Sequence, residues 1–186
     1  SLSLETRAAI NTLVAEATTP DREARIAANI RYYRSIYKGR YYGLWGLYHV
    51  VQAEVNKTAP MALQLARQAI PVRTIAMLNL DGKMMIPTET AGGGISYTTM
   101  PYTVDSENAA LVNGIEPFVT IAKAPLTLFP LTGDASPYRH SDALTKVGGR
   151  FGRMQPFAIE PASAPRGFWA DAIIISRGSP ATRPLP

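Results

Sequence analysis

The sequence IAANIRYYRSIYKGRYYGLWGLYHVVQAEV spans residues 26–55 and carries one continuous apolar and aromatic stripe. At about 100° per residue, the stripe fits within a wedge of about 80° on a single helical face. Its members are Ile26, Ile30, Tyr33, Tyr37, Tyr41, Leu44, Tyr48, Val51 and Val55. The pattern predicts one long tyrosine-rich helix, roughly 45 Å in length if it is continuous. Gly39, Gly43 and Gly46 lie on its opposite face, and a kink there is the alternative.

Composition limits the classes of protein to which the chain can belong. It has 186 residues, of which 46% are hydrophobic and 18% charged, which predicts a single folded unit over residues 1–186. The chain has no cysteine and two histidines, so disulfides, thiolate sites and histidine-rich metal sites are excluded. We expect no cofactor and no metal. We also expect no signal peptide and no transmembrane segment, and hence a protein that is soluble or held within an assembled particle.

The net charge of +5 is unevenly distributed. Residues 1–48 carry seven basic and four acidic side chains, residues 49–138 carry five and seven, and residues 139–186 carry seven and three. Two positive ends therefore flank a slightly negative middle. This arrangement suits an anionic partner or contacts between copies of the chain, although an ordinary mildly basic surface explains it equally well.

The sequence predicts an α+β fold with helices first. Residues 1–70 form the helical layer, which begins with a short helix capped by Ser3 and ends with a helix over residues 61–70. Residues 72–131 form an antiparallel β layer, with a hairpin over residues 72–86 that turns at Asp81-Gly82 and a second turn at Asn113-Gly114. Further strands are expected over residues 95–104, 118–122 and 126–129. The remaining segments are an extended arm at 132–166, a final strand at 167–176 and a proline-rich tail at 177–186.

Aromatic and basic residues alternate in the long predicted helix. Because tyrosine, tryptophan and arginine are enriched at protein interfaces, one hypothesis is an interface formed by Tyr33, Tyr37, Tyr41, Trp45 and Tyr48. Cations among aromatic rings also suit single-stranded nucleic acid. That hypothesis assigns phosphate contacts to Arg31, Arg34 and Lys38, together with Arg150 and Arg153 of the glycine-rich segment KVGGRFGR.

No motif identifies a catalytic site. Ser141, His140 and Asp142 are adjacent in the sequence, whereas the members of a catalytic triad come from separate elements. We interpret His140 as a loop residue and His49 as a packed or interface residue. Asp171 lies within an apolar strand, where burial raises a carboxyl pKa unless an arginine pairs with it. The sequence therefore assigns no catalytic residues and favours a protein that is not an enzyme.

These features favour a structural subunit of a large assembly, such as a viral coat (virion), a filament or another particle. Its partners would be other copies of itself or sister subunits, and its basic arms would neutralise packaged nucleic acid. The alternative hypothesis is a single-stranded nucleic-acid-binding protein. An enzyme with an unrecognised pocket is the third hypothesis.

Overall fold

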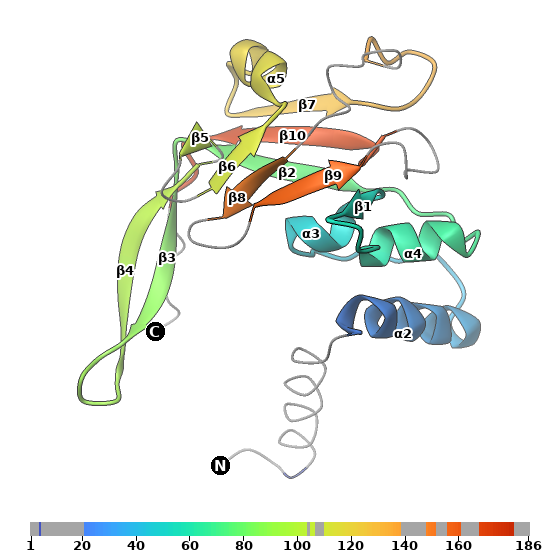
Figure 1. The fold of residues 1–186 in the computed structure, drawn as a ribbon, viewed down its shortest axis with the longest axis horizontal. Helices are drawn as coiled ribbons and strands as arrows, with labels where there is room; N and C mark the ends of the chain where they lie inside the picture. The colour runs from blue at the N-terminus through green and yellow to red at the C-terminus, as the bar shows by residue number, and fades with distance from the viewer. Residues whose placement is uncertain are drawn as a thin grey trace.

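The computed structural model describes residues 4, 21–103, 105–106, 110–138, 148–151, 156–160 and 168–180. Helices and antiparallel sheets are both present (Figure 1), so the predicted α+β class is confirmed. The described helices are α2 (Arg22–Ile36), α3 (Leu47–Val50), α4 (Met61–Arg67) and α5 (Glu116–Ile121). The described strands are β1 (Glu54–Val55), β2 (Ile75–Leu80), β3 (Gly82–Glu89), β4 (Ile95–Tyr102), β5 (Asp105–Ser106), β6 (Ala110–Asn113), β7 (Leu126–Pro130), β8 (Gly148–Phe151), β9 (Phe157–Glu160) and β10 (Ala172–Arg177).

The long predicted helix is the main error. Helix α2 ends at Ile36, because Tyr37 adopts an extended conformation (φ −102°, ψ 132°), and residues 37–46 are not helical. Gly39 has a φ of +132°, which a helix does not accommodate. The hydroxyl of Tyr41 instead donates to the carbonyl oxygens of Tyr33 and Tyr37, so the chain folds back on the end of α2. Periodicity alone cannot detect such a reversal.

A three-stranded sheet with the order β2-β10-β7 lies at the centre of the structure. Strand β10 pairs with β2 in parallel and with β7 antiparallel, so Ile174 is opposite Met77 on one side and Leu128 on the other. The strand predicted at 126–129 is thus confirmed, whereas β10 matches only the second half of the final strand predicted at 167–176, because residues 168–171 are not in a strand. The parallel pairing of β2 with β10 was not predicted, because the two strands are far apart in the sequence.

The predicted hairpin over residues 72–86 is wrong in its pairing. Asp81 does separate two strands, and Gly82 is the first residue of the second one, but β2 pairs with β10 whereas β3 pairs with β4. The β3–β4 ribbon extends away from the central sheet (Figure 1). Strand β10 offers β2 a long apolar neighbour, and this pairing prevails over the local turn signal.

Two further expectations need correction. Gly114 has a φ of +86° and leads into helix α5, so Asn113-Gly114 is not a hairpin turn. The strand predicted at residues 118–122 is mostly this helix. Its Glu116 carboxylate accepts a hydrogen bond from the N–H of Gly114 at 3.1 Å, and Pro117 occupies the first turn, where proline is tolerated.

A second sheet has the order β1-β9-β8-β6-β5, and all of its pairings are antiparallel. Strands β8 and β9 fall within residues 132–166, which were predicted to form an extended arm. The first predicted helix, capped by Ser3, lies outside the described residues except for position 4, as do residues 181–186 of the predicted tail. Within the part of the chain that the structure describes, no helix combines the length and the apolar character needed to span a bilayer.

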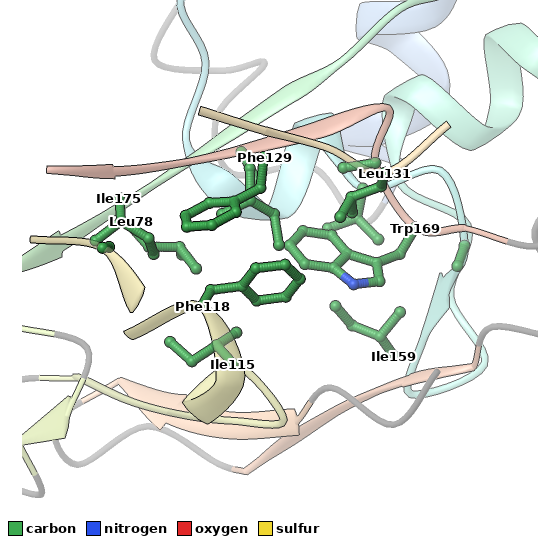
Figure 2. Close-up of a cluster of buried hydrophobic side chains, with 14 of the residues drawn as sticks. Leu78, Ile115, Phe118, Phe129, Leu131, Ile159, Trp169 and Ile175 are labelled. Atoms are coloured by element: carbon green, nitrogen blue, oxygen red, sulfur yellow. The ribbon is translucent and has the colours of Figure 1, made fainter. Parts of the chain in front are cut away.

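The main hydrophobic core lies on the inner face of the central sheet (Figure 2). Phe118 of α5 is fully buried, and its ring makes contacts with Phe129 at 4.9 Å and Tyr138 at 5.1 Å between ring centroids. Trp169, also buried, extends the same cluster toward Ile159 of the second sheet. The core therefore joins the two sheets and helix α5.

Replacing Phe118 with alanine should lower the free energy of unfolding by about 3–5 kcal/mol, because it removes a buried ring and leaves a cavity. Urea denaturation followed by circular dichroism measures the change. Leu126→Ala is the control, since Leu126 is 64% exposed and its truncation should cost less than about 0.5 kcal/mol. Equal effects of the two substitutions would contradict this description of the core.

Candidate functional site

A carboxylate and a histidine meet where helices α2, α3 and α4 come together. The Nδ1 atom of His49 in α3 lies 2.8 Å from the Oε1 atom of Glu23 in α2. The second oxygen of Glu23 accepts a hydrogen bond from the backbone N–H of Met61, at the start of α4, at 2.8 Å. The side chains of His49 and Glu23 are only 13% and 12% exposed. One carboxylate thus connects three helices, and the imidazole beside it keeps a small opening to solvent.

Glu23 and His49 form a close electrostatic pair. Their separation is that of a charge-assisted hydrogen bond, but the N–H of His49 does not point directly at the oxygen. Contacts of catalytic pairs are often misaligned in the absence of substrate and tighten when it binds. The geometry therefore fits a histidine that a carboxylate orients through Nδ1, which leaves Nε2 for chemistry.

Aromatic residues surround the histidine ring. The rings of Trp45 and Tyr48 contact it edge-on, with centroid distances of 6.1 Å and 5.9 Å. Burial and the charge of Glu23 raise the pKa of Tyr48 above its ordinary value, while a hydrogen bond with the Thr58 side chain acts in the opposite direction. Tyr48 therefore keeps its proton at neutral pH, and its hydroxyl can donate a hydrogen bond.

This pair could not be predicted from the sequence. His49 was interpreted above as a packed or interface residue, and Glu23 was not singled out. No spacing rule connects the two positions, because the chain reverses direction between them. Among the residues that the structure describes, no group of three or more histidine, aspartate and glutamate side chains could hold a metal ion.

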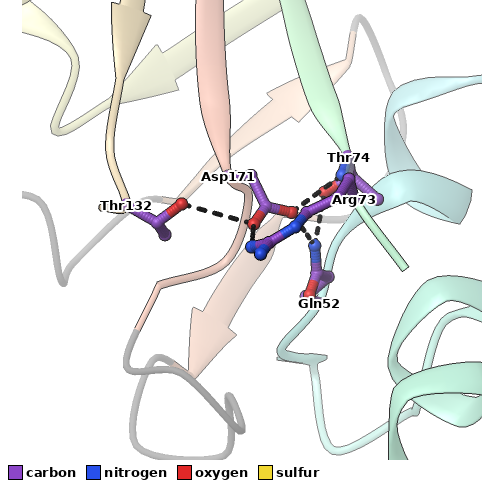
Figure 3. A network of polar contacts seen from close by, with 5 residues as sticks. All are labelled: Gln52, Arg73, Thr74, Thr132 and Asp171. Atoms are coloured by element: carbon purple, nitrogen blue, oxygen red, sulfur yellow. Dashed lines mark hydrogen bonds and ion pairs between the residues drawn. The ribbon is translucent and has the colours of Figure 1, made fainter. Parts of the chain in front are cut away.

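A second polar cluster surrounds Asp171, just before β10 (Figure 3). Its carboxylate accepts hydrogen bonds from the Thr74 backbone N–H at 2.8 Å and from the Gln52 side-chain amide at 2.6 Å. Arg73 forms an ion pair with it at 2.7 Å, and the Thr132 hydroxyl lies at 3.3 Å. The Gln52 amide also donates to the Thr74 hydroxyl at 2.9 Å. These contacts connect four separate segments of the chain, so the cluster holds the fold together.

The sequence left open whether an arginine pairs with Asp171, and in the structure Arg73 does so. Burial raises the pKa of this carboxyl, but the hydrogen bonds from Thr74, Arg73 and Gln52 and the charge of Arg73 outweigh that effect. The net result is a pKa below the ordinary value. Asp171 is therefore ionised at neutral pH and stabilised by its partners.

The residues predicted to form an interface lie at the end of α2, in the loop that follows and in α3. Tyr33, Tyr37, Tyr41 and Trp45 are all exposed, and Tyr48 is partly buried against the core. The rings of Tyr33 and Tyr37 are stacked, with 6.4 Å between their centroids. The aromatic group is therefore real, but it does not form a helical stripe, and its role as an interface stays a prediction.

The residues predicted to bind nucleic acid are only partly described. Arg31 and Arg34 lie on α2, and Lys38 lies just beyond it. The backbone of Arg150 belongs to β8, whereas Arg153 and His140 lie outside the described residues. The structure does not test whether these cations contact phosphates, and that assignment stays a prediction.

The fold is similar to that of an enzyme. No family model matches the chain, and no curated protein matches it. Among solved structures, a mutant of an erythromycin esterase, EreC, in its open conformation matches with a TM-score of 0.51 and 17% sequence identity. The match covers 85% of this chain and 36% of the esterase, so the chain spans about a third of that protein's length. At this level of identity the likeness concerns the fold alone.

This match overturns the functional interpretation of the sequence. We expected a structural subunit of a coat, filament or particle, and we expected the chain not to be an enzyme. Both expectations are wrong, because the fold is shared with an esterase. The low charged fraction and the aromatic residues, on which that interpretation relied, are equally compatible with an enzyme fold that has exposed aromatic loops. The match does not support the nucleic-acid alternative either.

The lowered pKa of Asp171 predicts that the free energy of unfolding depends on pH. Because its pKa is lower in the folded state, Asp171 stabilises the fold above its unfolded pKa of about 3.9, and this stability is lost as the pH falls through the folded pKa. Asp171→Asn should cost about 2–4 kcal/mol of unfolding free energy at neutral pH. Urea denaturation at decreasing pH measures the unfolding free energies of the variant and of the unmodified protein. The difference between these two free energies should become smaller below about pH 4.

Glu89→Gln is the matched control for Asp171→Asn, because Glu89 is an exposed carboxylate on the β3–β4 ribbon. It should change stability little at any pH. If Asp171→Asn lowers the unfolding free energy by the same amount at every pH, the charge of Asp171 does not contribute to stability.

Proposed function

We propose that the chain carries an ester-hydrolase centre in which His49 acts as the general base and Glu23 orients it. The observation that carries this proposal is the mostly buried Glu23–His49 pair, with 2.8 Å between the carboxylate oxygen and Nδ1. The likeness of the fold to that of an erythromycin esterase supports the choice of reaction class. In the residues that the structure describes, His49 is the only histidine, and an imidazole is the side chain most often used as a general base.

Each group has a defined part in the proposed reaction. With Nδ1 protonated and facing Glu23, the lone pair of Nε2 can accept a proton from water. The resulting hydroxide attacks the acyl carbon of the ester, and the carbon–oxygen bond to the alcohol breaks. The proton on His49 then passes to the departing alkoxide, which gives a carboxylic acid and an alcohol. Glu23 stabilises the imidazolium that forms between these two proton transfers.

Tyr48 and Trp45 shape the surroundings of the base. Because the pKa of Tyr48 is raised, its hydroxyl stays protonated and can donate a hydrogen bond to the carbonyl oxygen of the ester, on which the negative charge develops. Trp45 is 44% exposed while its ring contacts His49, so it offers an apolar surface to the substrate next to the base. A water-poor environment on this side would strengthen the electrostatic effect of Glu23.

The test measures kcat/KM of the purified chain for a chromogenic acyl ester such as 4-nitrophenyl butyrate. His49→Gln should lower kcat/KM by about 10²- to 10⁴-fold, which is the usual contribution of a general base. Glu23→Gln should lower it by at least about tenfold, because the imidazole loses its orienting charge. Unfolding curves of both variants check that they are folded, since Glu23 also binds the start of α4.

His140→Gln is the control for imidazole reactivity in general, because His140 is the other histidine of the chain. Glu89→Gln is the control for loss of a carboxylate. Both variants should keep the activity of the unmodified protein. Equal activity of His49→Gln and His140→Gln, or turnover no faster than free imidazole supports, would overturn the proposal.

A further inference from the structure

The loop of residues 37–46, which we call the aromatic loop, exposes large apolar side chains to solvent. Leu44 is fully exposed, Tyr42 is 89% exposed and Tyr37 is 61% exposed. Ile36, the last residue of α2, adds an aliphatic side chain that is about half exposed. Soluble proteins seldom expose such a concentration of apolar residues without a partner.

Side chains alternate in direction along the second half of the aromatic loop. The Tyr41 hydroxyl binds carbonyl oxygens at the end of α2, and the Trp45 ring contacts His49, so both of these residues face the body of the protein. Tyr42 and Leu44, which lie between them, are the two most exposed large hydrophobic residues of the loop. The loop is therefore held by one set of side chains while the other set projects outward.

The sequence that contains the aromatic loop is rich in basic residues. Between Glu23 and Glu54 the sequence has no acidic residue, and this stretch carries Arg25, Arg31, Arg34, Lys38 and Arg40. Within the described part of the chain, Lys38 and Arg40 of the loop form no ion pair with an acidic side chain. Their charge is thus available to an anionic partner.

We propose that the aromatic loop docks on the surface of a membrane that contains anionic phospholipids. Exposed tyrosine and tryptophan side chains favour the bilayer interface, and exposed leucine and isoleucine side chains gain free energy when they insert between headgroups. Lys38 and Arg40 match the negative charge of the lipid headgroups. Such contact needs no spanning helix, and the described residues contain none.

Lipid explains more of this surface than nucleic acid does. Stacking on bases would use Tyr37 and Tyr42, and phosphates would bind the cations, but neither interaction uses the exposed aliphatic residues Leu44 and Ile36. Insertion into a lipid interface uses all of these groups together. The contact of Trp45 with His49 would also bring the candidate hydrolase centre close to the membrane surface.

Co-sedimentation with vesicles tests this proposal. The full chain should bind phosphatidylcholine vesicles that contain about a third phosphatidylserine, and it should bind pure phosphatidylcholine vesicles far more weakly. Replacing Tyr42 and Leu44 together with serine should lower the partition coefficient at least tenfold, because the inserted apolar area is lost. Lys38→Gln and Arg40→Gln should each lower it about fivefold at low salt.

Matched controls distinguish binding through the aromatic loop from non-specific binding through other exposed apolar or basic residues. Leu126→Ser removes an exposed leucine from β7, and Lys83→Gln and Lys123→Gln remove exposed cations elsewhere. All three should bind like the unmodified protein. Circular dichroism confirms that every variant is folded.

Three results would overturn the proposal. The first is a failure to bind the phosphatidylserine vesicles. The second is binding that Leu126→Ser weakens as much as the Tyr42 and Leu44 double substitution does. The third is that the protein binds a single-stranded oligonucleotide but not vesicles, and that this binding is lost when Lys38 and Arg40 are replaced. That result would assign the surface to nucleic acid.

Discussion

Asp171 accepts hydrogen bonds from segments of the chain that are far apart in the sequence, and the arrangement of the central sheet depends on it. Its partners come from the segment after α3, from the residues just before β2 and from the loop just after β7 (Figure 3). A mostly buried carboxylate is costly unless its oxygens are paired, so these partners must all be in place together. This requirement determines where the parallel pairing of β2 with β10 begins. At that point the backbone N–H groups of Asp171 and Ala172 both donate to the carbonyl oxygen of Thr74.

The same network positions the candidate functional site. Gln52 follows α3 closely, and both its side chain and its backbone are held, since its N–H donates to the Trp169 carbonyl at 2.7 Å. Helix α3 is short and has no buried residue of its own, so it relies on these neighbouring contacts for its place. Glu23 approaches His49 from the other side, on a helix that packs on α4 through Ala27, Met61 and Leu65. The Glu23–His49 pair is thus placed by contacts on both sides, although α3 itself has only four residues.

The sequence predicts local features well and long-range ones poorly. The apolar run at 126–129 identifies β7, the run at 167–176 includes most of β10, and the helix predicted over 61–70 corresponds to α4. The arginine that pairs with Asp171 could be expected from the cost of an unpaired buried acid. The pairing partner of each strand could not be predicted. The turn residues at Asp81-Gly82 favour a local hairpin, but β2 pairs instead with the distant strand β10, whose position depends on the whole fold.

The end of α2 and the pairing of Glu23 with His49 were missed for a related reason. The apolar stripe continues through residues 37–46 with helical spacing, and only the hydrogen bonds of Tyr41 with the end of α2 show that the chain turns there. Once the helix is assumed to continue, Glu23 and His49 are placed far apart. The error about the helix therefore led to the error about function. With Glu23 and His49 placed far apart, no acid–base pair was recognised, and the aromatic residues were interpreted as an assembly interface.

The central claim is that Glu23 fixes the orientation and the tautomer of His49. The most direct measurement is the ¹⁵N chemical shifts of the His49 imidazole at a pH where the ring is neutral, assigned with the His140→Gln variant. The account predicts that the proton resides on Nδ1, facing Glu23, and that Glu23→Gln lowers the population of this tautomer. A proton that resides on Nε2 in both proteins would contradict the account, because the nitrogen proposed to act as the base would then be occupied.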